Sequence, residues 1–127
     1  MPARQSHKPS VAVCLAAFNG LQYLQPQVDS ILGQTDVDIT VYVSVDRSTD
    51  GTEDWFCGLQ SREARIVLLP FGETFGGAAR NFFRLLREVD FSPFEYIAFA
   101  DQDDIWQPGK LKRAADCLLE QGVDGYS

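Results

Sequence analysis

Three carboxylates stand within four residues, at Asp101, Asp103 and Asp104. Like charges held this close repel one another unless a cation neutralises them. Carboxylate oxygens are the ligands that hard ions such as Mg²⁺ and Mn²⁺ prefer, and alternate residues of an extended segment point to the same side. The spacing therefore favours a divalent metal held by Asp101 and Asp103. A solvated acidic turn ahead of a helix that begins at Pro108 explains the same residues.

Two further polar segments contain residues that could bind a nucleotide. The glycine-rich stretch 72–77 precedes a predicted helix, so its backbone amides and Arg80 could face a phosphate. A tight connection with Arg80 in solvent is the alternative. Asp46 ends a segment rich in β-branched residues, where its carboxylate could accept hydrogen bonds from a base or a ribose, or could instead shape the turn over 46–51.

These polar segments follow short apolar stretches that are typical of buried strands. Strands are predicted over residues 11–18, 38–46, 65–69 and 96–100. Helices are predicted over 21–34, from Thr52, over 78–89 and from Pro108. This alternation predicts an α/β fold with a mostly parallel sheet and helices on both faces. Because ligands of such sheets bind beyond the carboxyl ends of the strands, we expect the polar segments to meet there.

The helix predicted over 78–89 carries apolar residues at helical spacing. Phe82, Leu85, Leu86 and Val89 share one face, which is expected to pack against the sheet. Aromatic residues at helical positions belong more often to a core than to a ligand site. We therefore expect the rings of Trp55, Phe82 and Phe83 in the core.

Composition narrows the class of protein. The 127 residues are 45% hydrophobic, and Lys plus Arg number 11 against 18 Asp plus Glu, for a net charge of −7. A single globular domain over 10–127 with a loose arm over 1–9 is expected, and duplex binding is not, because phosphate contacts need clustered cations. Three separated cysteines and the lack of a long apolar segment predict a cytoplasmic protein with reduced thiols.

Taken together, the strand-end motifs resemble the family 2 glycosyltransferases with the GT-A fold. The motifs are Ala16-Ala17-Phe18-Asn19, the stretch 46–52, the stretch 76–82, and the stretch 99–108 with its DQDDIW-x-P pattern. The resemblance runs from about Val11 to Leu119. The last motif resembles the rhamnosyltransferase-like branch of bacterial cell-surface polysaccharide synthesis.

The resemblance implies a function and a set of site residues. It implies that a UDP- or dTDP-linked sugar is bound with Mg²⁺ or Mn²⁺. The sugar would then be transferred to a saccharide or lipid-linked acceptor. Asp103 and Asp101 would be the metal-contacting pair of a DxD element. The nucleotide-binding residues would be Ala16, Phe18, Asn19, Asp46, Gly77, Arg80 and Asp101. A cytoplasmic enzyme at the inner face of the membrane is implied.

The chain departs from the family's pattern in two respects. It has Val45-Asp46 followed by Arg47, where the family usually has two consecutive acids and then a small or polar residue. The family's catalytic base lies well downstream of the metal motif, in an acceptor-binding half that is expected beyond Ser127. We therefore expect this chain to bind the donor without transferring the sugar, and to self-associate through apolar surface left uncovered.

Two other classes of protein share features with this sequence. A receiver-type phospho-acceptor domain has a similar length, acidity and strand-helix alternation, but it needs paired acids after the first strand, where this chain has Phe18-Asn19. A non-catalytic nucleotide-binding module would use the same strand-end residues. Stabilisation by nucleotide would distinguish the nucleotide-binding classes from the receiver class.

Overall fold

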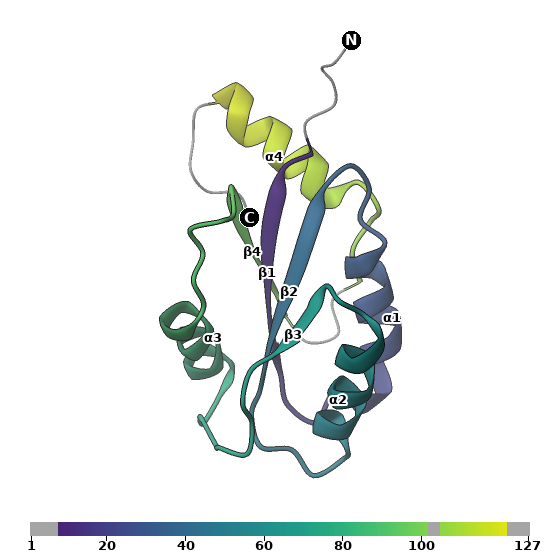
Figure 1. Ribbon diagram of the computed structural model, residues 1–127, viewed down its shortest axis with the longest axis vertical. Helices are drawn as coiled ribbons and strands as arrows, with labels where there is room; N and C mark the ends of the chain where they lie inside the picture. The colour runs from purple at the N-terminus through teal and green to yellow at the C-terminus, as the bar shows by residue number, and fades with distance from the viewer. Residues whose placement is uncertain (1–7, 102–104, 122–127) are drawn as a thin grey trace.

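The computed structural model describes residues 8–101 and 105–121 and shows a parallel four-stranded sheet with helices on both faces (Figure 1). The strands are β1 (Ser10–Ala17), β2 (Asp38–Val45), β3 (Ile66–Leu68) and β4 (Tyr96–Ala100). The helices are α1 (Leu21–Leu32), α2 (Thr52–Arg62), α3 (Ala78–Glu88) and α4 (Lys110–Gln121). The predicted fold class and the order of its elements are confirmed.

Strand β1 is an inner strand of the sheet and is buried on both faces. The strand order is β3-β2-β1-β4, so β1 pairs in parallel with β2 on one side and with β4 on the other. Its continuous apolar run is what burial on two faces requires. Cys14 lies within this strand at 0% exposure, and burial raises the pKa of its thiol to about 12.

One face of the sheet is covered by α1 and α2. Leu24, Val28 and Ile31 of α1 recur at spacings of four and three residues and are fully buried, as expected for one face of a helix. They belong to one apolar cluster with the side chains of β1 and β2 that point to this face. The cluster also includes Phe56 of α2 and Leu111 of α4. This cluster is the main core of the domain.

The other face is covered by α3, which lies apart from α1 and α2 in Figure 1. The apolar face predicted for this helix is wrong in part. Leu85 of that face is buried but Leu86 is 43% exposed, and Asn81 and Arg84 are buried instead. The separate expectation that the Phe83 ring lies in the core is also wrong, because Phe83 is 60% exposed. With this side of the helix toward the sheet, Asn81 and Arg84 both make hydrogen bonds to Ser44 of β2.

The strand ends meet at one edge of the sheet. Ala17 is in register with Val45, and Leu15 with Ala100, so the residues that follow β1, β2 and β4 emerge side by side. The chain places β2 and β3 on one side of β1 and then β4 on the other, which makes β1 the point where strand order reverses. Ligands of α/β sheets bind at such points. In the part of the chain that the structure describes, no helix has the length and apolarity needed to cross a membrane.

Candidate functional site

A cleft of about 450 Å³ opens at the carboxyl ends of β1, β2 and β4. Five of the seven residues predicted to bind a nucleotide line it, namely Ala16, Phe18, Asp46, Gly77 and Asp101. They come from four separate segments of the chain, which the parallel strands bring to one place. The first turn of α3 completes the wall with Ala78, Asn81 and Phe82.

Asp46 is buried at the base of this cleft, and its carboxylate binds backbone amides. One oxygen accepts hydrogen bonds from the N–H groups of Phe75, at 2.7 Å, and Arg47, at 3.1 Å. The other accepts from Gly76 and Gly77, at 3.3 and 3.4 Å. Four amides use the acceptor capacity of a carboxylate. Asp46 therefore holds the glycine-rich segment against the end of β2, which is a larger role than shaping its own turn.

The glycines of this segment are required by the backbone conformation. Gly76 has φ +90° and Gly77 has φ +135°, a region that residues with a side chain rarely adopt. This conformation turns both amides toward Asp46 and leads directly into α3. The first turn of α3 contains no acidic residue and no side chain caps it, so the partial positive charge of the helix N-terminus is left at the cleft wall.

Asn19 does not line the cleft. Its side-chain oxygen accepts a hydrogen bond from the N–H of Thr49 at 2.8 Å, and its own N–H donates to Ser48 Oγ at 3.0 Å. Asp50, in the same turn, accepts from the N–H groups of Leu21 and Thr52, each at 3.0 Å. Asn19 and Asp50 thus connect the turn after β2 to the start of α1.

The carboxyl of Asp50 is tuned by these contacts. Although partial burial opposes ionisation, hydrogen bonds from the side chain and backbone of Thr52 and from the backbone of Leu21 hold its pKa below the ordinary value of 3.8. Asp50 therefore shapes the turn after β2 and binds it to the first residue of α1.

Arg80 lies beside the cleft and not in its wall. Its side chain is exposed on the first turn of α3, next to Gly76, where a Cβ atom would stand 3.6 Å from Arg80 Nη1. The structure therefore leaves both sequence-based interpretations of Arg80 open.

The segment after β4 is attached to α1 at both ends. The backbone carbonyl of Asp101 accepts a hydrogen bond from the buried side chain of Gln27, and the N–H of Trp106 donates to Ser30 Oγ at 3.0 Å. The Asp101 side chain itself is exposed and lines the cleft. Trp106 is buried in the main core instead.

Of the predicted metal-contacting pair, Asp103 lies outside the described residues. Among residues 8–101 and 105–121, no three histidine, cysteine or acidic side chains gather in a way that could hold a metal ion. Within these ranges Asp101 is the predicted metal ligand that the structure places, and it stands at the cleft.

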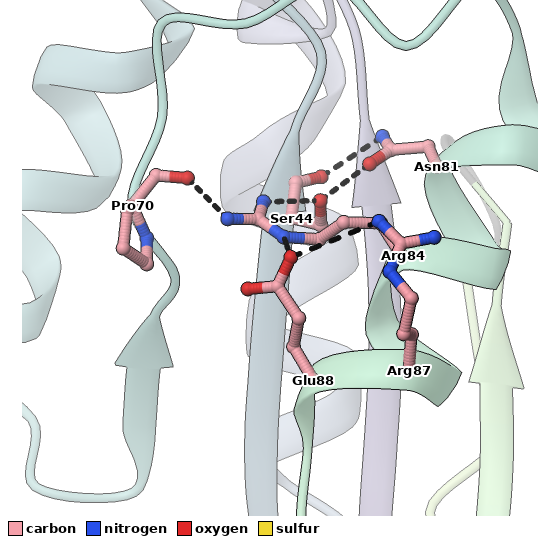
Figure 2. A network of polar contacts seen from close by, with 6 residues as sticks. All are labelled: Ser44, Pro70, Asn81, Arg84, Arg87 and Glu88. Carbon is pink, nitrogen blue, oxygen red and sulfur yellow. Dashed lines mark hydrogen bonds and ion pairs between the residues drawn. The ribbon is translucent and has the colours of Figure 1, made fainter.

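A polar network behind the cleft was missed by the sequence-based analysis (Figure 2). Arg84 of α3 is 2% exposed, and its Nη1 donates to Ser44 Oγ at 2.9 Å. Ser44 Oγ in turn donates to Asn81 Oδ1, while Asn81 Nδ2 donates to the backbone carbonyl of Ser44 at 3.0 Å. A sequence signal did exist: Asn81, Arg84 and Glu88 share one helix face, and every second residue of β2, namely Asp38, Thr40, Tyr42 and Ser44, carries a polar group.

The model of the Glycosyl transferase family 2 family matches residues 12–127 of this chain. The chain belongs to glycosyltransferase family 2. A dTDP-rhamnosyl transferase, RfbG of Shigella flexneri, is 42% identical over 114 residues, which cover 89% of this chain and 39% of that protein. The family resemblance that the motifs predicted is confirmed, including its rhamnosyltransferase-like branch. The chain spans about two fifths of the length of this family member.

Solved glycosyltransferase structures share the fold. The S. aureus TarS structure in complex with UDP-GlcNAc superimposes with a TM-score of 0.75 at 21% identity, over 93% of this chain and 36% of that one. The mannosyltransferase PcManGT of Pyrobaculum calidifontis, in complex with GDP-Man and Mn²⁺, gives a TM-score of 0.75 at 23% identity, over 88% and 33%. These likenesses confirm the predicted GT-A fold for this family 2 chain.

Proposed function

We propose that this chain binds the nucleotide of a nucleoside diphosphate sugar, UDP- or dTDP-linked, in the cleft at the strand ends. The observation that carries the proposal is the meeting of Phe18, Asp46, Gly77 and Asp101 around one cavity. Family membership and the nucleotide-bound fold relatives support it. The sugar is then transferred to a cell-surface polysaccharide or to a lipid-linked acceptor.

The two walls of the cleft suit the two parts of such a ligand. Ala16 and Phe18 offer apolar surface on which a pyrimidine ring can pack. On the opposite wall, the start of α3 at Ala78, for which Gly77 supplies no capping side chain, favours the negative charge of a diphosphate. Arg80, beside Gly76, would add a second positive charge.

The carboxylate oxygens of Asp101 are ligands of the kind that a hard divalent cation prefers. Its carboxylate is exposed at the cleft, and its backbone is held in place by Gln27, so the oxygens are available to an ion that also contacts a diphosphate. Mg²⁺ or Mn²⁺ would be held by Asp101 together with Asp103. The ion would stabilise the charge that develops on the departing nucleoside diphosphate.

Calorimetry with UDP and dTDP, in the presence of Mn²⁺ and then of EDTA, tests the proposal. We expect binding in Mn²⁺ and a loss of affinity of about tenfold or more in EDTA. Asp101→Asn should weaken nucleotide binding measured in Mn²⁺ and leave binding measured in EDTA unchanged. Asp38→Asn is the matched control, because Asp38 is an exposed acid at the opposite end of β2. Equal affinity with and without EDTA would contradict the metal site.

We further propose that the 127-residue chain alone binds the donor but does not transfer the sugar. A positioned general base contributes about 10²–10⁴ in rate, and none of the described carboxylates at the cleft is free to serve: Asp46 binds four amides and Asp101 is assigned to the ion. A radiolabelled-donor assay against saccharide and lipid-linked acceptors checks this. Transfer at the rate of a chain extended to the length of its relatives would refute it.

A further inference from the structure

Arg84 is a charged side chain in a buried place. It is 2% exposed, and the carboxylate that neutralises it, Glu88 at 2.9 Å, belongs to the same helix and is itself 39% exposed. Taking a guanidinium out of water is costly, and an apolar side chain of similar size packs such a position at no electrostatic cost. A contribution to stability therefore does not explain why arginine stands here.

The guanidinium joins three segments of the chain (Figure 2). Nε binds Glu88 on α3, Nη1 donates to Ser44 Oγ on β2 at 2.9 Å, and Nη2 donates to the carbonyl of Pro70 at 2.6 Å. The Phe75 ring also lies against it, with its centroid 5.1 Å from Arg84 Cζ. Pro70 and Phe75 belong to the segment between β3 and α3, so Arg84 contacts this segment at two points.

The segment 70–77 contains no helix or strand, and its last residues form a wall of the cleft. Its backbone is held toward β2 by Asp46, through the amides of Phe75, Gly76 and Gly77, and by the N–H of Arg47, which donates to the Glu73 carbonyl at 3.0 Å. These contacts act from the strand end. Arg84 holds the same segment from the α3 side.

Through Ser44, Arg84 also reaches the first turn of α3. The hydroxyl that accepts from Arg84 donates to Asn81, and Asn81 lines the cleft. Arg84 itself does not line the cleft. Its influence on a ligand must therefore pass through the segment 70–77 and through Asn81.

We propose that Arg84 is a positioning residue whose guanidinium fork fixes the segment 70–77 and the start of α3, and thereby sets the shape of the cleft. The inference rests on the proposed function in one respect, that a nucleotide occupies this cleft. According to this proposal, Arg84 contributes to the affinity for the nucleotide although it does not line the cleft.

The fork and the charge of Arg84 can be separated by substitution. Arg84→Lys keeps the charge, but one ammonium on a flexible stem cannot reach Ser44, Pro70 and Glu88 in the same planar geometry. Arg84→Met keeps much of the packing and removes the charge. If the fork is what matters, both variants loosen the segment 70–77 to a similar degree.

Hydrogen exchange and calorimetry together test the proposal. In Arg84→Lys we expect amide exchange at Phe75, Gly76 and Gly77 to rise about tenfold, because local opening of this segment becomes easier, while β1 amides exchange as in the wild type. Affinity for UDP or dTDP with Mn²⁺ should fall about tenfold, in line with the loss of hydrogen bonds made by a charged group. Arg87→Lys is the matched control, since Arg87 lies on the same helix and is 67% exposed.

Each other outcome overturns the proposal. Unchanged exchange at residues 75–77 would show that Arg84 does not hold the segment. Faster exchange there with unchanged nucleotide affinity would show that the position of the segment does not affect binding, and faster exchange throughout β1 would indicate a global structural role. If Arg84→Met does not fold, Ser44→Ala removes one partner and should give the same pattern at reduced size.

Failure of the proposed function gives a different pattern. A wild-type chain that binds neither nucleotide would refute the nucleotide site, and the exchange rates of 75–77 would still report whether Arg84 holds the segment. Partial rescue of affinity by Arg84→Lys over Arg84→Met, without a difference in exchange, would assign the effect to charge and refute the role of the fork.

Discussion

On one face of the sheet, α1 and α2 pack leucine, valine, isoleucine and phenylalanine against β1 and β2, whereas on the other face α3 meets β2 through Ser44, Asn81 and Arg84. Apolar contacts are non-directional and tolerate small shifts. Hydrogen bonds fix distances and angles. The first face therefore supplies most of the free energy of folding, and the second determines where the wall of the cleft stands.

Of the substitutions that compare the two faces, one on the apolar face should have the largest effect on the free energy of unfolding. Leu24→Ala removes a side chain of α1 with 0% exposure and should lower the free energy of unfolding by about 2–5 kcal/mol through lost burial and a residual cavity. Urea denaturation followed by circular dichroism measures this. Leu21→Ala, three residues earlier and 39% exposed, is the control and should cost far less. Equal losses would show that α1 is not packed as described.

At the cleft, Asp46→Ala should reduce binding of both parts of the ligand. Removing the carboxylate leaves the amides of Phe75, Gly76 and Gly77 without their acceptor, at a cost of about 1 kcal/mol for each hydrogen bond, so we expect the whole segment to shift. Calorimetry with a nucleoside and with pyrophosphate, measured separately, should show similar losses. A loss confined to the nucleoside would instead indicate that Asp46 contacts the base or ribose directly.

A smaller effect is expected from the turn that connects β2 to α1 and α2. The pKa of Asp50 is lowered in the folded chain, so its carboxylate stabilises the fold above the ordinary pKa of 3.8, and this contribution is lost as the pH falls through the lower folded value. When the pH is lowered from neutral to acid, the free energy of unfolding should therefore fall more steeply for the wild type than for Asp50→Asn. Parallel curves would contradict the role of Asp50.

The smallest effect is predicted on the outer surface of α3. Phe83 is 60% exposed, so Phe83→Gln should change the free energy of unfolding by no more than about 0.5 kcal/mol. Leu85→Gln, two residues later and 0% exposed, should be strongly destabilising. Thermal denaturation of both variants compares the two faces of α3 directly. A severe loss in Phe83→Gln would show that this ring packs in the core, as the sequence predicts.

Much of the fold and part of the site could be predicted from local patterns. The apolar runs, each followed by polar residues, identified the strands to within one residue at their ends. Because parallel strands bring their carboxyl ends together, the same patterns placed Phe18, Asp46 and Asp101 at one edge. The strand-end motifs were specific enough to identify the family.

The sequence by itself determined the strands, their ends and the family, because these depend on neighbours in the chain and on the alternation of strand and helix. Only the tertiary structure decided which side of α3 faces the sheet, that Asn19 binds the turn after β2 instead of lining the cleft, and that Asp46 and Arg84 both contact the segment 70–77. Arg84 and Ser44 are 40 residues apart, and Asp46 and Phe75 are 29 apart. A local pattern shows that such groups are polar, but their partners are chosen by the packing of α3 on the sheet, which brings distant donors and acceptors within hydrogen-bonding distance.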